Sequence, residues 1–199
     1  SSIANASDDV IYTWAGPEIA VATTKGYTTQ LSVIYLIAVW AARILKTMDA
    51  DRVERIFDDI CRLPELIEKV ILSEPKIKEM AKHCGDPKSL FFIGRNIDYA
   101  VSLEASLKLK EISYIHSEAY AAGELKHGTI SLIENGTVVI AVATDDRLLP
   151  KIISKINCYF ICTNITCKPN QIWFKSIKQA IPIDVIERDH IVSIQRIII

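Results

Sequence analysis

The sequence predicts an α/β protein with a parallel sheet flanked by helices on both faces, arranged as two incomplete subdomains. The apolar runs at residues 89–93 and 137–143 lack alternation, which is typical of strands buried on both faces of a parallel sheet. Helical patterns alternate with these runs along the chain. Each half of the sequence also places a strand-like run before a glycine turn and a helix.

The first half of the chain is predicted to be mostly helical. Residues 10–14 are expected to form a short strand, which the Ala-Gly-Pro turn at 15–17 ends. A long apolar helix is predicted from about 27 to 45, with Thr23 or Thr24 as its N-cap. Because its apolar part is too short to span a bilayer, we expect a buried helix. Further helices are predicted at 49–63, 65–72 and 75–82.

The Cys-Gly-Asp-Pro turn that begins at Cys84 is the predicted boundary between the two subdomains. We assign residues 1–84 to the first subdomain, 85–165 to the second, and 166–199 to a tail without clear periodicity. The elements expected in the second subdomain are strands at 89–93, 113–116, 137–143 and 158–163, helices at 99–111 and 148–156, and a helical piece from 127 to about 135.

Composition excludes some classes of partner. The net charge of −1 gives no overall field that would attract nucleic acid or an anionic membrane, so we expect neither as a partner. The five cysteines form no regular framework, which favours reduced thiols in a cytoplasmic protein. Cys158, Cys162 and Cys167 could be interpreted as a metal cluster, but no fourth ligand has matching spacing, so no metal site is predicted. The N-terminus lacks the pattern of a signal peptide.

The segment KLKEISYIHSEAYAAGELKHG, residues 108–128, concentrates acids, bases and cations. Lys108 and Glu111 are three apart on a predicted helix and therefore share one face. A lysine beside a carboxylate keeps the carboxylate ionised, and such a carboxylate can take a proton from a carbon next to a carbonyl. A surface salt bridge is the alternative interpretation. His127 is suited to proton shuttling or, alternatively, is an exposed or capping histidine, whereas His116 is expected to be packed and hydrogen-bonded.

Two other stretches have the residue types of a binding loop. Residues 18–25, EIAVATTK, offer small residues, backbone amides and hydroxyls at a predicted helix start, which suits an anion or a sugar but also suits ordinary capping. The Gly-Arg-Asn sequence at 94–96 could face a ligand or simply turn the chain.

Three stretches carry a family resemblance: GPEIAVATTKGYTTQL at 16–31, LFFIGR at 90–95, and LEASLKLKEISYIHSEAYAAGELKHG at 103–128. Over about residues 1–157, the chain resembles the isomerase half of the glutamine–fructose-6-phosphate aminotransferases, also called glucosamine-6-phosphate synthases. The resemblance implies sugar-isomerase (SIS) subdomains with a flavodoxin-like, three-layer αβα fold.

The resemblance also implies roles for particular residues. The family makes glucosamine 6-phosphate, a precursor of UDP-N-acetylglucosamine, from fructose 6-phosphate and glutamine-derived ammonia. Glu111 would move a proton between C1 and C2 of the sugar, with Lys108 beside it. His127 would assist ring opening across the interface of a homodimer, and Val21 and Thr23 would contact the sugar. No metal or organic cofactor is implied.

The sequence also departs from the family pattern. It begins after the family's glutaminase domain and phosphate-binding loops, and after about residue 157 it no longer follows the family, whose tail carries an imine-forming lysine. We therefore expect a truncated fragment that makes no measurable glucosamine 6-phosphate alone. The alternatives are a non-catalytic module that binds a sugar phosphate, and an SIS isomerase or deglycase for another sugar phosphate.

Overall fold

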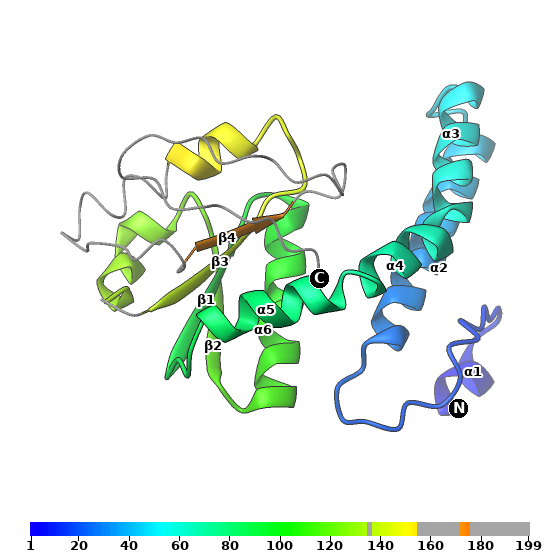
Figure 1. Cartoon of the computed structure of the whole chain (residues 1–199). Helices are drawn as coiled ribbons and strands as arrows, with labels where there is room; N and C mark the ends of the chain where they lie inside the picture. Colours follow the sequence, from blue (N-terminus) through cyan, green and yellow to red (C-terminus); the bar gives the residue numbers. More distant parts are fainter. Residues whose placement is uncertain (135–136, 155–171, 176–199) are drawn as a thin grey trace. The chain divides into compact units, whose positions relative to one another are not determined.

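The computed structural model describes residues 1–134, 137–154 and 172–175. The chain divides into two compact units, Ser1–Leu72 and Ser73–Ile199. In Figure 1 the first unit is coloured from blue to cyan, and the second begins in blue-green. The sequence-based subdomain boundaries at 84 and 165 remain predictions about the family's organisation.

The first unit is helical over the greater part of its length. Its helices are α1 (Ser2–Ala6), α2 (Lys25–Ile44), α3 (Ala50–Cys61) and α4 (Leu63–Ile71). Helix α2 contacts α3, and α3 in turn contacts α4 (Figure 1). The predicted helices at 27–45, 49–63 and 65–72 are thereby confirmed, and every end agrees to within two residues, which is the usual uncertainty of a helix boundary.

The expectation that α2 is a buried helix is wrong for this chain. Val39 is its one buried residue, whereas the apolar side chains of Ile34, Trp40 and Ile44 are exposed. A helix that is apolar on several faces needs partners on each of them, and within this unit α3 alone is in extensive contact with it. None of the helices in the described part of the chain is both long and apolar enough to cross a membrane.

Residues 10–14 do not form the predicted strand. They have no regular structure, Ile11 and Tyr12 are exposed, and Trp14 has a positive φ of 54°. A strand persists when its backbone groups pair with another strand, and residues 1–72 contain none. The β-branched and aromatic residues that suggested a strand therefore had no sheet to join.

The second unit is built on a parallel sheet. It contains α5 (Glu74–His83), β1 (Ser89–Gly94), α6 (Ile97–Ser113), β2 (His116–Ala121), the 3₁₀ turns η1 (Leu125–His127) and η2 (Thr129–Leu132), β3 (Val138–Val142) and β4 (Ile172–Lys175). The strand order is β2-β1-β3-β4, and each neighbouring pair is parallel. The predicted parallel sheet is thus confirmed.

Alternate residues of the sheet pack on its two faces. On one face Leu90, Phe92 and Val138 join Ala105 of α6 in a buried cluster. On the other face a second cluster combines strand residues with side chains from η1 and the helical segment 149–154; its buried members are Phe91, Ile93, Ala122, Leu125, Ile133, Val139, Ala141, Ala143 and Ile152. Helical segments therefore cover both faces, as the sequence predicted.

The position of β2 corrects the prediction of a strand at 113–116. Helix α6 continues to Ser113, and its C-cap residue Tyr114 adopts the left-handed conformation with φ 61° and donates its amide proton to the carbonyl of Lys110. The strand begins at His116, whose side chain is 62% exposed, so the expected packed histidine is wrong as well. The helical residues 149–154 fall inside the predicted helix at 148–156, and Leu148 lies in the turn before them; positions 155 and 156 and the predicted strand at 158–163 lie outside the described residues.

The junction between β1 and α6 fixes where α6 lies on the sheet. A Cβ atom on Gly94 would collide with the backbone of Asp98 and Tyr99, so the strand and the helix approach at a distance that only glycine allows. Asn96, with φ 53° and ψ −124°, turns the chain into the helix. Ser102, buried one turn into α6, donates a hydrogen bond to the carbonyl of Asp98.

Candidate functional site

One flank of α6 presents a lysine between two glutamates. Glu104, Lys108 and Glu111 are spaced i, i+4 and i+7, which places them on one side of the helix. The ammonium Nζ of Lys108 donates to Oε2 of Glu111 at 2.5 Å and lies 3.6 Å from Oε1 of Glu104. The three side chains are only 14% (Lys108), 21% (Glu104) and 25% (Glu111) exposed. The predicted pairing of Lys108 with Glu111 is present in the structure.

The electrostatics of this cluster are dominated by the Lys108–Glu111 pair. The hydrogen bond to Glu111 raises the pKa of Lys108, and the nearby charges of Glu111 and Glu104 act in the same direction against partial desolvation. A short, charge-assisted bond in a partly enclosed setting is stronger than an exposed surface pair. The arrangement places a carboxylate next to a cation, which is what a general base and an electrostatic stabiliser require.

Glu104 is the member of this cluster that sequence reasoning missed. Its signal is nevertheless in the sequence, because Glu104 precedes Lys108 by four residues, the other spacing that brings helical side chains together. The two contacts differ in kind. At 2.5 Å Glu111 makes a hydrogen bond, whereas at 3.6 Å Glu104 makes an ion pair longer than a direct hydrogen bond.

His127 lies near the carboxyl ends of the strands, whereas Glu111 lies near their amino ends. Helix α6 starts after the carboxyl end of β1 and runs back, so that β2 then begins at His116, which pairs with the first residue of β1. A rise of about 1.5 Å per residue puts Glu111 about 20 Å along the helix from its first turn. His127 follows β2, in a segment anchored at the carboxyl edge by a 2.8 Å bond from the amide of Ala122 to Gly94 O.

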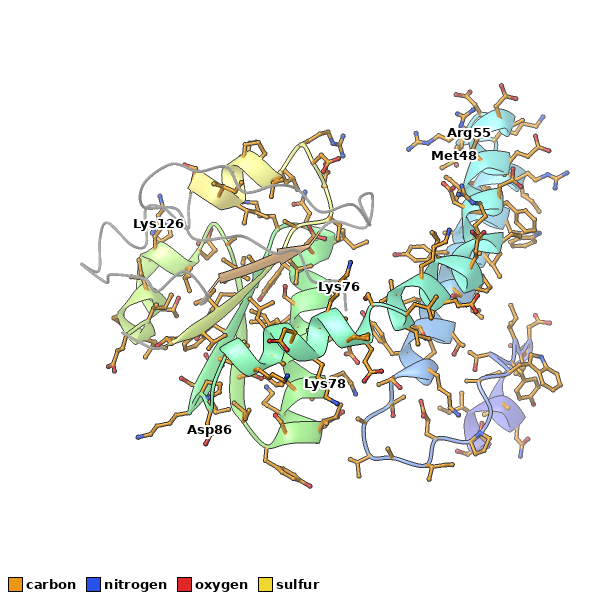
Figure 2. The ribbon with its side chains drawn as sticks, viewed as in Figure 1. Met48, Arg55, Lys76, Lys78, Asp86 and Lys126 are labelled. Atoms are coloured by element: carbon orange, nitrogen blue, oxygen red, sulfur yellow. The ribbon has the colours of Figure 1, made fainter. Side chains whose placement is uncertain are left out.

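The exposure of His127 agrees with this placement. The histidine ends η1 and is exposed, and its backbone amide donates to the carbonyl of Glu124 at 2.9 Å. Figure 2 labels its neighbour Lys126 at the upper left of the second unit. The topology therefore brings Lys108 and Glu111 together and leaves His127 of the same chain at a distance from them.

Val21 and Thr23 belong to the loop before α2, in the first unit. Both are exposed, whereas Ala22 between them is buried. Thr24 occupies the predicted N-cap position, but its side chain makes no capping hydrogen bond.

The loop is fastened to α2 by two other side chains. Oε1 of Glu18 accepts the amide proton of Gly26 at 2.9 Å, and Nζ of Lys25 donates to the carbonyl of Pro17 at 2.6 Å. A carboxylate at the start of a helix stabilises the free amides there. Glu18 therefore supplies the cap that the sequence had suggested for a threonine.

The Gly-Arg-Asn segment, which begins at the last residue of β1, makes the turn into α6, one of the two interpretations left open by the sequence. Arg95 is half-buried, and within the described part of the chain its Nε is a buried atom without a hydrogen-bond partner. The guanidinium end lies towards Gly123, where an added Cβ would be 3.7 Å from NH2. A contact with a ligand at this turn stays a prediction.

A second polar contact lies on β2. The hydroxyl of Tyr120 donates a very short hydrogen bond to Oε2 of Glu118, and this bond raises the pKa of Tyr120 to about 12. The ring of Tyr120 also packs on Phe91, with centroids 5.8 Å apart. Nε2 of His116 lies 3.7 Å from the other oxygen of Glu118. Among the described residues no group of three or more histidine, cysteine or acidic side chains is arranged to hold a metal ion.

Comparison with known proteins identifies the family to which the chain is similar. Residues 85–154 match the model of the SIS domain. The chain is 53% identical over 156 residues to a glutamine–fructose-6-phosphate aminotransferase (isomerizing) of Clostridium acetobutylicum, and 52% identical over 156 residues to the protein of that name from Caldanaerobacter subterraneus. Each match covers 78% of this chain and 26% of the relative, so the chain spans about a quarter of the length of these relatives.

A solved structure gives the same assignment. The C-terminal domain of glucosamine-fructose-6-phosphate aminotransferase from Francisella tularensis superposes with a TM-score of 0.82 at 29% identity, covering 98% of this chain and 53% of that one. The sequence-based resemblance is therefore confirmed. The chain belongs to the glutamine–fructose-6-phosphate aminotransferase family as a segment of its isomerase domain, with an SIS domain at residues 85–154.

Proposed function

We propose that this chain supplies the central part of an isomerase site that acts on fructose 6-phosphate during the synthesis of glucosamine 6-phosphate. The observation that carries the proposal is the 2.5 Å bond between Lys108 and Glu111 on the partly enclosed flank of α6. A carboxylate held ionised by a neighbouring cation can take the proton from C1 of the open-chain sugar and return it at C2. Glu111 is this base in our proposal. The ammonium of Lys108 offsets the negative charge that develops on the sugar when the proton leaves.

The proposal assigns the other predicted residues to binding and ring opening. Val21 and Thr23, on their exposed loop, contact the sugar. His127 assists ring opening in the site of a second copy of the chain, since its place at the carboxyl edge keeps it from the Glu111 of its own chain. Our proposal further includes a cytoplasmic homodimer that takes part in amino-sugar synthesis, because His127 of one copy would serve the site of the other.

The experiment that tests this function is a segment exchange. The 156 residues of the Clostridium acetobutylicum relative that match this chain are replaced by the corresponding residues of this chain, and glucosamine 6-phosphate is measured with fructose 6-phosphate and glutamine. We expect product, because the exchanged segment supplies Lys108 and Glu111. A chimera that is as heat-stable as the relative, but forms no product, would contradict the proposal.

The same chimera separates the two alternatives. Heat stabilisation by fructose 6-phosphate without turnover would indicate a module that only binds a sugar phosphate. Turnover of a different sugar phosphate in preference to fructose 6-phosphate would indicate another isomerase or a deglycase.

A further inference from the structure

Glu104 is placed to act on the proposed site through Lys108. It lies one helical turn before the lysine and, with a side chain 21% exposed, shares the partly enclosed flank of α6. Its Oε1 is 3.6 Å from Nζ of Lys108, on the opposite sequence side from Glu111. The ammonium therefore has a carboxylate on either side in the sequence, Glu111 at hydrogen-bond distance and Glu104 at ion-pair distance.

The charges of the cluster change when a proton is transferred. With both glutamates ionised, the two carboxylates and the ammonium sum to −1. When Glu111 carries a proton, it no longer balances the ammonium of Lys108, whose side chain is only 14% exposed. A partly desolvated cation without a counter-ion is costly and tends either to move or to lose its proton. At that step Glu104 is the remaining carboxylate within ion-pair distance.

We propose that Glu104 is a positioning residue of the isomerase site, which keeps the ammonium of Lys108 charged and in place while Glu111 carries the substrate proton. This inference rests on the proposed function, because that function gives Glu111 a protonated state in its cycle. Two carboxylates on one lysine then have separate tasks. Glu111 exchanges the proton with the substrate, and Glu104 keeps the ammonium of Lys108 charged and in its position.

The test measures the titration of Lys108 in the 199-residue chain. Lysine labelled with ¹³C at Cε reports its own protonation by NMR, and the resonance of Lys108 is assigned by its loss in Lys108→Met. Glu111→Gln imitates the protonated base, since glutamine has the same shape without the charge. We expect the pKa of Lys108 to be lower in the double variant Glu104→Gln/Glu111→Gln than in Glu111→Gln alone.

Equal titration of Lys108 in these two variants would overturn the proposal. The matched control is Glu65→Gln, which removes the glutamate of another i,i+4 pair, Glu65 with Lys69, whose side chains are 61% and 59% exposed. It should leave Lys108 unchanged. If the double variant does not fold, Glu104→Asp and Glu104→Asn in the Glu111→Gln background ask the same question, because they differ in charge alone.

A kinetic measurement tells a positioning role from a merely structural one. In the chimera described above, Glu104→Gln should lower kcat by roughly tenfold with little change in KM, because Lys108 is then held less firmly during the proton transfer. Glu104→Asp should recover part of the loss. A change confined to KM would contradict the assignment. If the unsubstituted chimera is inactive, the proposed function fails, whereas the titration of Lys108 still decides whether Glu104 holds it.

Discussion

The carboxylate of Asp98 accepts two hydrogen bonds from Thr144, one from the backbone amide at 3.0 Å and one from the hydroxyl at 2.6 Å. Asp98 is buried in the first turn of α6, and Thr144 follows β3, 46 residues later. These two hydrogen bonds tie the start of the helix to the end of the neighbouring strand β3. It therefore fixes the helix on which Lys108 and Glu111 lie.

Removing this carboxylate should destabilise the second unit. We expect Asp98→Ala to lower the free energy of unfolding by about 2–4 kcal/mol, because it removes two bonds to a charged group and leaves the Thr144 amide without its partner. Asp98→Asn, which can still accept a hydrogen bond, should cost about half as much. Urea denaturation followed by circular dichroism measures both variants, and equal stability of Asp98→Ala and the unsubstituted chain would contradict the account.

The close approach of β1 and α6 gives a second prediction. Gly94→Ala should lower the free energy of unfolding by about 3 kcal/mol or more, since the new methyl group meets the backbone of Asp98, which cannot rotate away. Gly123→Ala is the control, because the nearest atom to its added Cβ is the end of the Arg95 side chain, at 3.7 Å. Similar urea midpoints for the two variants would show that the junction is looser than described.

The charged pair on α6 should make stability depend on alkaline pH. The pKa of Lys108 is raised, so the folded chain binds this proton more tightly than the unfolded chain does. The resulting stabilisation is fully present below the ordinary lysine pKa of 10.5 and is lost as the pH rises through the raised value. The difference in urea midpoint between the unsubstituted chain and Lys108→Met should thus shrink between about pH 8 and about pH 11.

A matched surface pair is the control for that measurement. Lys82 and Glu79 have the same i,i+3 geometry, but their side chains are 67% and 62% exposed. Water screens such a pair, so Lys82→Met should change the midpoint little at either pH. A midpoint difference for Lys108→Met that is the same at both pH values would contradict the strong pairing of Lys108 with Glu111.

Tyr120 should be recognisable by its late ionisation. The hydrogen bond to Glu118 raises its pKa to about 12, because ionising the phenol would break the bond and place two negative charges together. A titration step near this value should appear in the tyrosinate absorbance at 295 nm, and Tyr120→Phe should remove that step. In Glu118→Gln the step should move down towards the ordinary value of 10.0; an unchanged step would show that another group causes the shift.

The sequence was informative where structure depends on local pattern. The apolar runs at β1 and β3 identify buried strands because both of their faces are covered, and α6 is recognised by its helical spacing. The Lys108–Glu111 pair could be predicted for the same reason. Two side chains three positions apart on a helix are neighbours, whatever the rest of the fold.

The features that were missed depend on contacts between distant residues. The strand β2 has the polar sequence HSEAYA and is a strand because Ser89–Gly94 pairs with it. The opposite error occurred at residues 10–14, where residues that favour strands had no partner. The separation of His127 from Glu111 was not missed, because the family resemblance implied that His127 acts across a dimer interface; it follows from the direction in which α6 crosses the sheet, which the local pattern around each residue does not contain.

The central claim is that Glu111 moves the proton between C1 and C2 of fructose 6-phosphate. Its most direct test uses the chimera in deuterated solvent. Proton NMR measures how fast the C1 hydrogen of fructose 6-phosphate is replaced by deuterium. We predict that Glu111→Gln slows the exchange at least about 100-fold, the usual contribution of a general base, while the exposed control Glu79→Gln leaves it unchanged. Exchange by a folded Glu111→Gln chimera at the rate of the unsubstituted chimera would contradict the account.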